Sequence, residues 1–222
     1  MKLAYIGLLI SFLWMAGVLA GAFYFSPSAE ILGETSRIIY FHVPVAWICV
    51  LAFCMSFWFS ISYLRTRRAE LDVNAEVTAR LGLWFCILAT ITGAVFAKSA
   101  WGMYWNWDPR EVSITVILLV YMAYFGLRSS VPDPERRMKL SAVYSIMAFV
   151  LMPFLIFVVP WIYSSLHPDT IINVQGENKL LDGRMRMVFF FSLAGFTFVY
   201  LWMYRISARI EKLVRRKEGW NV

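Results

Sequence analysis

Six long apolar runs, nearly free of charge, limit what this chain can fold into. They cover roughly residues 3–25, 43–64, 81–97, 112–127, 141–163 and 187–204. A helix that crosses a bilayer needs about 20 apolar residues, with a range of about 17–25. The third and fourth runs are short, so we expect Arg80 and Glu111 to flank them at the membrane interface. With 60% hydrophobic residues, the chain is predicted to be an all-α integral membrane protein with six transmembrane helices, forming a single domain over residues 1–222.

The first apolar run has some features of a signal peptide. Lys2 precedes it, and the small residues 20–22 lie near its end. Its apolar segment is nevertheless longer than the hydrophobic region of a signal peptide, which has about 7–15 residues. We therefore expect the run to be an uncleaved transmembrane helix.

The distribution of basic residues predicts the orientation in the membrane. If the N-terminus is inside, 15 of the 21 Lys and Arg residues fall in inner segments and six in outer segments. Basic residues collect on the cytoplasmic side, so both termini are predicted to be cytoplasmic. A charged inner loop is expected at residues 65–80, and a basic tail at residues 205–222 is expected to lie against the anionic inner leaflet. This topology accounts for the net charge of +7, and nucleic-acid binding is not needed to explain it.

Several common functional motifs are absent. All three cysteines lie within apolar runs, and no CxxC or CxxCH motif occurs, so neither a redox dithiol nor a covalent haem attachment site is encoded. There is also no GxxxxGK[ST] motif, which argues against ATP hydrolysis by a P-loop in this chain.

A tryptophan-rich loop at residues 98–112, between the third and fourth helices, stands out because connecting loops are usually small and polar. It contains the sequence WGMYWNWDPR, with Trp101, Tyr104, Trp105 and Trp107 within seven positions. Large rings grouped outside a membrane span indicate a platform for a large, flat, apolar ligand. We expect Asp108 to orient this loop through backbone N–H groups or Arg110, and the proline that follows Asp108 to stiffen it.

The chain has only two histidines, and both are predicted to lie on the outer side. Helix 2 is expected to begin near Phe41, with Pro44 in its first turn, which places His42 near the outer surface. His167 follows helix 5, where Pro153 and the proline at position 160 predict a kink. Neutral imidazole is a common axial ligand of haem iron, so His42 and His167 are the candidate metal ligands of a haem b site. The candidate partners of the haem propionates are Arg37, Lys98, Arg110, Arg184 and Arg186.

A plain structural role is the alternative explanation for these residues. A histidine at a membrane interface is usually a satisfied polar residue, and tryptophan and tyrosine form interfacial belts in most membrane proteins. A belt explains one or two rings better than the WxxxWxW pattern followed by Asp-Pro-Arg. From the residues alone, a ring ligand the size of haem or quinone and a structural role both remain open.

The loop sequence resembles a known signature. WGMYWNWDPR at 101–110 is similar to the pattern WGxxWxWD-x-R/K of the haem-handling WWD family of cytochrome c assembly proteins. The six spans, the segment RIIYFHVPVAW at 37–47 and the His-Pro pair after helix 5 resemble the cytochrome c maturation protein C (CcmC) branch of that family. Larger relatives carry a further histidine pair, which this chain lacks. Many family members have Leu-Thr after the arginine, where this chain has Glu111 and Val112.

This resemblance implies a haem-handling protein of the bacterial inner membrane that presents haem to a partner and is not a conventional enzyme. It implies that haem is held at the periplasmic face and delivered to a periplasmic haem chaperone, and that ATP-binding-cassette subunits and a small single-span subunit belong to the same system. By resemblance, His42 and His167 are the axial ligands. The surface for haem and chaperone is expected to comprise Trp101, Gly102, Trp105, Trp107, Asp108 and Arg110.

Two other functions use the same residues differently. A haem-b electron-transfer subunit of a respiratory complex would have the same two ligands and would keep its haem. A haem permease or exporter is less favoured, because the apolar runs hold no charged residue well inside, and a dianionic porphyrin needs a polar path through a membrane.

Overall fold

The computed structural model describes residues 2–29, 32–167 and 182–219. Its helices are α1 (Lys2–Ala20), α2 (Ile39–Thr66), α3 (Ala69–Trp101), α4 (Pro109–Ser130), α5 (Pro134–Pro153), α6 (Val159–Ile162) and α7 (Gly183–Lys217). Short segments of other helix types extend α1 at Gly21–Phe25, precede α2 at Glu34–Ile38 and join α5 to α6 at Phe154–Val158. Six segments are long and apolar enough to cross a membrane, and the described residues contain no β-strand. The predicted all-α architecture with six spans is confirmed.

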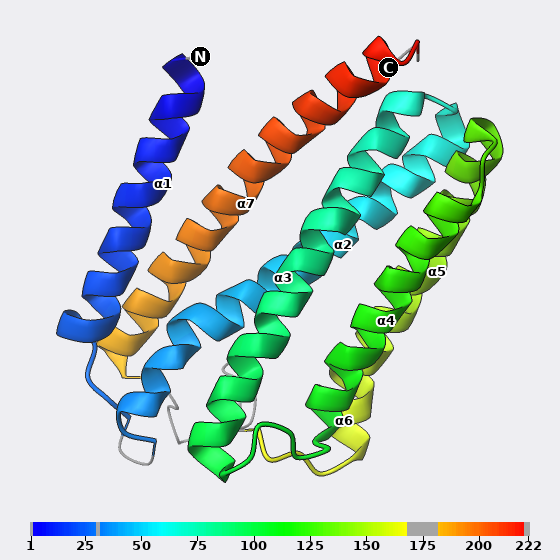
Figure 1. Ribbon diagram of the computed structural model, residues 1–222. Coiled ribbons are helices and arrows are strands. Elements are labelled where there is room, and N and C mark those ends of the chain that lie inside the picture. The colour runs from blue at the N-terminus through cyan, green and yellow to red at the C-terminus, as the bar shows by residue number, and fades with distance from the viewer. Residues whose placement is uncertain (1, 30–31, 168–181, 220–222) are drawn as a thin grey trace.

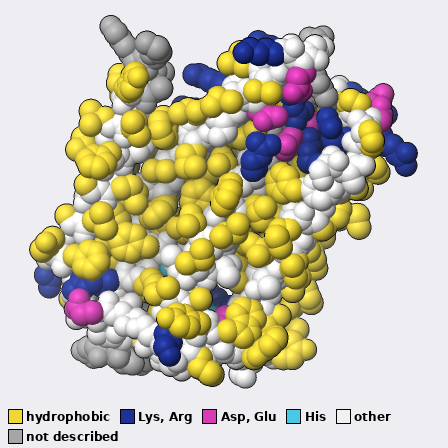
Figure 2. All heavy atoms as spheres, in the orientation of Figure 1, with side chains coloured by type: hydrophobic (Ala, Val, Ile, Leu, Met, Phe, Trp, Pro, Cys, Tyr) yellow, Lys and Arg dark blue, Asp and Glu magenta, His cyan; other side chains and the backbone are white. Residues whose placement is uncertain are grey.

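The helices run alternately up and down, so the connections between them lie at two opposite ends of the bundle (Figure 1). Residue 2 and Lys217 lie at one end, which we call the terminal end. The Trp101–Pro109 connection and the end of α6 lie at the other, which we call the histidine end. On the face shown in Figure 2, hydrophobic side chains cover a broad band, and charged side chains gather towards the two ends.

The prediction that residues 65–80 form a loop is wrong, because α2 ends at Thr66 and α3 already begins at Ala69. Only Arg67 and Arg68 connect α2 to α3, and Arg67 ends α2 with a left-handed φ of 58°. Residues 69–80 instead form the first turns of α3. The stretch has acidic residues in its first turn, which favours a helix N-terminus, and Val73 and Val77, at helical spacing, are buried. Residues 205–217 of the predicted basic tail likewise continue α7.

Helix α2 also begins earlier than expected, so Pro44 lies inside the helix and not in its first turn. A proline within a helix leaves the carbonyl four residues earlier without its N–H partner, which here is the carbonyl of Tyr40. The hydroxyl of Ser192 on α7 donates a hydrogen bond to that carbonyl. A neighbouring helix therefore satisfies the group that the proline frees, which is how membrane bundles tolerate such prolines.

The core of the bundle lies between α2, α3, α4, α5 and α7. Helices α2 and α3 form its most extensive pair. They approach closely where Gly82 faces Phe53, because a Cβ atom at Gly82 would lie 2.6 Å from that ring. Phe53 in turn stacks on Tyr121, with 3.4 Å between ring centroids. Near the histidine end, the helix geometry changes to a π-helix directly after Pro153, one of the two prolines for which a kink is predicted.

Candidate functional site

His42 points from α2 towards α3. Its Nδ1 atom lies 2.9 Å from Oγ1 of Thr92. The Thr92 hydroxyl has one proton, which it donates to the carbonyl of Leu88 at 2.8 Å, so it accepts a hydrogen bond from Nδ1–H of His42. The next residue, Gly93, leaves room for the ring, since a Cβ atom there would lie 3.0 Å from Cε1 of His42. This arrangement favours the tautomer in which Nε2 carries the free lone pair.

His167 is held by Asp108. The Nδ1 atom of His167 lies 3.0 Å from Oδ1 of Asp108, whose side chain is only 1% exposed. Ser165 donates a hydrogen bond to Oδ2 of the same carboxylate at 2.9 Å, and the N–H of Leu166 donates to it at 2.6 Å. Among the described residues, the side-chain hydrogen bonds of both histidines are made through Nδ1, and His42 also interacts with the backbone of Ala89.

Asp108 also begins helix α4. It accepts a hydrogen bond from the N–H of Arg110 at 2.9 Å, and Pro109 occupies the first helical position. Glu111 completes a capping box, because its carboxylate accepts from the N–H groups of Asp108 and Asn106. The expected orienting contact between Asp108 and the backbone of Arg110 is present. The residue that departs from the family pattern, Glu111, thus has a local structural role.

The charges of this cluster fit its geometry. Burial raises the pKa of the Asp108 carboxyl, but the N–H groups of Arg110 and Leu166, the Ser165 hydroxyl and His167 outweigh burial and hold that pKa below its usual value. Burial lowers the pKa of His167, and the charge of Arg110 lowers it further, against the opposing effect of Asp108. His167 is therefore neutral, and Asp108 ionised, near neutral pH.

The two histidines lie close enough to interact electrostatically, although position 42 and position 167 are far apart in the chain. Helix α3 contributes a neighbouring side chain to each of them. Thr92 contacts His42, and Phe96, one turn further along, lies 6.5 Å from the His167 ring between centroids. Four residues of α-helix rise by about 6 Å, so the two imidazoles border neighbouring turns of the same helix.

The aromatic residues of the loop divide into two groups. Trp101 packs edge-on against His167, with 4.8 Å between ring centroids, and also contacts Phe96. Trp105 and Trp107 form a separate edge-on pair at 5.5 Å. Trp107 is 78% exposed and has a φ of 57°, a left-handed conformation that costs a non-glycine residue roughly 1–2 kcal/mol. The loop therefore places one ring beside a histidine and presents another outward.

Gly102 ends helix α3 with a φ of 86°. No atom lies within 4 Å of the place that a Cβ atom would occupy, so the residue serves a turn and not a close backbone approach within the chain.

The five candidate cations differ in what they already bind. Arg37 pairs with Glu34 and donates to the carbonyls of residues 22 and 26, and Lys98 donates to the carbonyl of Gly102. Arg184 lies 3.9 Å from Asp182, and Arg186 is exposed. By contrast, Arg110 lies near His167 and has a buried Nε atom without a hydrogen-bond partner among the described residues. Of the five, Arg110 is the best placed to bind a carboxylate in the site.

A cavity of about 310 Å³ lies at the same end of the bundle, but neither histidine and none of Trp101, Trp105, Trp107 and Arg110 lines it. Phe41, the neighbour of His42, and Phe96, the neighbour of His167, both line it, together with Arg37 and Val95. Its volume is at the lower limit of small-molecule pockets, which span about 300–1,000 Å³.

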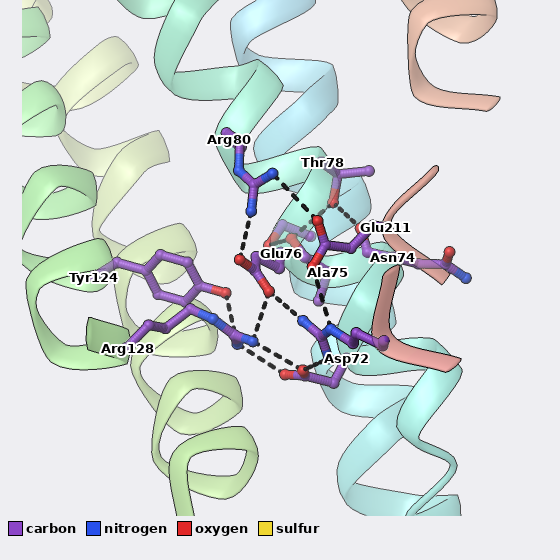
Figure 3. A network of polar contacts seen from close by, with 11 residues as sticks. Asp72, Asn74, Ala75, Glu76, Thr78, Arg80, Tyr124, Arg128 and Glu211 are labelled. Atoms are coloured by element: carbon purple, nitrogen blue, oxygen red, sulfur yellow. Dashed lines mark hydrogen bonds and ion pairs between the residues drawn. The ribbon is translucent and has the colours of Figure 1, made fainter. Parts of the chain in front are cut away.

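A second polar cluster lies at the terminal end and was not predicted (Figure 3). Asp72 and Glu76 on α3 bind Arg128 on α4, and Arg215 on α7 binds the same two carboxylates. Asp72, Arg128 and Arg215 are buried. A larger cavity of about 620 Å³ adjoins this cluster and is remote from the histidines. In the sequence these charges fall in predicted inner segments, and nothing in their spacing indicates that they meet.

The histidines and the loop are recognisable in the sequence, but three residues that contact the histidines were not predicted, namely Thr92, Phe96 and Ser165. Thr92 and Phe96 lie within an apolar run, where nothing distinguishes them from packing residues. Only Ser165 could have been suspected of contacting His167, because it lies two residues before it in the sequence.

Comparison with known proteins gives a consistent result. A family model described as "Heme exporter protein C" (CcmC) matches residues 2–222. The chain is 30% identical to the heme exporter protein C of Bradyrhizobium diazoefficiens, over 83% of this chain and 69% of the relative. It is 29% identical to that of Escherichia coli K12, over 78% and 69% of the two chains. A putative ccmC-like mitochondrial protein of cytochrome c biosynthesis in Marchantia polymorpha is 26% identical, over 88% of this chain and 85% of the relative.

Proposed function

The chain belongs to the heme exporter protein C family of cytochrome c biogenesis, and from this premise we propose that His42 and His167 hold haem between them at the histidine end of the bundle. One observation carries the proposal. The only two histidines of the chain lie at the same end, and in the described part of the structure both make their side-chain hydrogen bonds through Nδ1, which leaves Nε2 available for a metal. Histidine ligands of metals usually donate their other N–H to an acceptor in this way.

The surrounding residues fit this cargo. Haem supplies an iron that binds two imidazoles and a flat apolar ring that carries two carboxylates. Thr92 and Asp108 hold protons on the Nδ1 atoms, and Trp101 packs against the His167 side of the site. Arg110 provides a positive charge for one propionate. Trp107, exposed and held in a strained conformation, presents a ring to a partner.

We propose that the histidine end faces the periplasm of a bacterial inner membrane and that a periplasmic haem chaperone is the recipient. The positive-inside rule supports this orientation, since basic residues are more numerous towards the terminal end. The resemblance to cytochrome c assembly proteins supports the recipient, and it also supports ATP-binding-cassette subunits and a small single-span subunit as partners in the membrane.

Presentation at one face is favoured over passage through the bundle. Apolar and aromatic side chains such as Phe53 and Tyr121 fill the core between the two ends. The described part of the bundle therefore offers no polar path for a dianionic porphyrin.

Spectroscopy of the purified protein tests the proposal. Visible absorption should show bound haem in the native chain, and His42→Ala combined with His167→Ala should abolish it. Mixing the haem-loaded protein with the chaperone should then transfer the haem. Permanent retention would favour an electron-transfer subunit, and an unchanged spectrum in the double variant would refute the proposed ligands.

A further inference from the structure

Asp108 makes more contacts than a helix cap requires. Its two oxygens accept hydrogen bonds from the N–H groups of Arg110 and Leu166, from the hydroxyl of Ser165 and from the imidazole of His167. Only the contact to Arg110 belongs to the cap of α4. The other three bind the segment 165–167, which follows α6 and is 57 or more positions away in the sequence.

Two other aspartates show what capping alone requires. Asp133 caps α5 by accepting from the N–H of Arg136 at 2.6 Å, and Asp182 caps α7 by accepting from the N–H of Arg184 at 3.3 Å. Both are exposed, whereas the Asp108 side chain is 1% exposed. Burying a carboxylate is costly unless several donors satisfy it. The burial of Asp108 and its second set of donors therefore point to a task other than starting a helix.

The hydrogen bond to His167 determines which ring nitrogen is free. An ionised carboxylate can only accept, so the proton of the neutral imidazole lies on Nδ1 and Nε2 keeps its lone pair. The Ser165 hydroxyl has one proton, which its contacts with Asp108 take. Trp101, packed edge-on at 4.8 Å, limits rotation of the ring. The tautomer and the orientation of the imidazole thus both depend on contacts made at the tryptophan-rich loop.

We propose that Asp108 is the positioning residue of His167: it fixes the Nδ1–H tautomer, directs Nε2 into the site and ties this histidine to the tryptophan-rich loop. The inference rests on the proposed role of His167 as a haem ligand. It adds that the loop controls the ligand through one buried carboxylate, and that loss of the carboxylate damages ligation even where the loop and helix α4 remain folded.

The variant Asp108→Asn separates this role from capping. Asparagine is a good helix cap, so helix α4 should still form. Its side-chain NH2 group can donate to Nδ1, which would favour the opposite tautomer with the proton on Nε2. Loss of a carboxylate that orients a histidine ligand typically costs about 10–100-fold in metal affinity. Asp133→Asn is the matched control, because it changes a capping aspartate that contacts no histidine among the described residues.

Nitrogen NMR of the haem-free protein, labelled with ¹⁵N in its histidine rings, gives the direct measurement. Only two imidazoles contribute, and His42→Ala assigns them. In the native chain His167 should be in the Nδ1–H form. Asp108→Asn should shift His167 towards the Nε2–H form and leave His42 unchanged, and Asp133→Asn should affect neither.

Haem titration of the same variants supplies the second measurement. Asp108→Asn should weaken binding by about 10–100-fold, and Asp133→Asn should leave binding at the native level. A native His167 in the Nε2–H form, or an unchanged tautomer in Asp108→Asn, would overturn the positioning role regardless of haem. If Asp108→Asn fails to fold, the native tautomer alone decides. An altered tautomer with native haem affinity would instead overturn His167 as a ligand.

Discussion

The buried ion-pair cluster at the terminal end predicts that Arg128 is essential for stability and not for haem binding. Its guanidinium lies 2.8 and 2.9 Å from the two oxygens of Asp72 and 2.8 Å from Glu76. Hydrogen bonds to charged groups contribute about 1.5–3 kcal/mol each. Removal of one partner from a buried pair costs about 3–5 kcal/mol, since the other charge is left buried. Because Arg215 still contacts both carboxylates, we expect Arg128→Met to cost about 3 kcal/mol, the lower end of that range.

Thermal unfolding of the detergent-solubilised protein, followed by circular dichroism, measures this loss. For a chain of this size about 1 kcal/mol shifts the Tm by roughly 2–4 °C, so the Tm of Arg128→Met should fall by about 6–12 °C. The matched control is Lys139→Met. It removes an exposed pair with Glu135, four residues earlier on α5, and such pairs contribute about 0.3–0.5 kcal/mol.

Two results would refute this reasoning. One is a Tm loss in Arg128→Met no larger than that in Lys139→Met, which would show that the cluster does not hold α3, α4 and α7 together. The other is strict additivity when Asp72→Asn is combined with Arg128→Met, because residues in one buried network should couple by about 0.5–3 kcal/mol. Haem bound per folded molecule should stay at the native level in every variant, since the cluster is remote from the histidines.

Three further predictions concern the histidine end. Gly93→Ala should weaken haem binding in titrations, because the added Cβ would lie 3.0 Å from Cε1 of His42, whereas Gly126→Ala, which meets no atom within 4 Å, should not. Arg110→Gln should lower haem affinity about tenfold or more, as expected from loss of a charged hydrogen bond, and haem dimethyl ester should bind native and variant chains equally. Haem affinity should be constant down to about pH 6.5, the ordinary imidazole value, and should fall only at lower pH, because the pKa of His167 is lowered and its neutral form persists; a loss already complete at pH 6.5 would contradict this.

The sequence was sufficient to predict that six helices span the membrane, but it was not sufficient to predict where these helices begin and end. Apolar runs report the part of a helix that lies in lipid, and all six runs correspond to helices. Residues 69–80 carry both signs of charge and look like a loop when only hydropathy is considered. They are helical, and Asp72 and Glu76 pair with arginines on two other helices, which satisfies their charges inside the bundle. Such pairing joins positions 52–143 residues apart, and a single sequence contains no trace of it.

The same limit applies to the candidate site. Histidine and tryptophan are rare and chemically distinctive, so their positions are informative in a sequence. The residues that give the histidines a defined tautomer are ordinary ones. Thr92 lies 50 positions from His42, and Asp108 lies 59 positions from His167. The role of Asp108 in the loop could be inferred from its neighbours, but its contact with His167 depends on how α4 packs beside the segment after α6.

The two histidines are supported in different ways, and the difference suits the proposed transfer of haem to a partner. His42 belongs to α2, which packs extensively against α3, and its ring contacts Thr92 and borders Gly93 of that helix. His167 follows the short helix α6 and depends on hydrogen bonds to Asp108, at the end of the loop that carries the exposed Trp107. In the proposed function, a partner that docks on Trp107 would therefore act on the segment that orients His167 and would not touch the contacts of His42. If His42 and His167 are the haem ligands, binding at His167 would then weaken first while His42 keeps the haem in place until transfer.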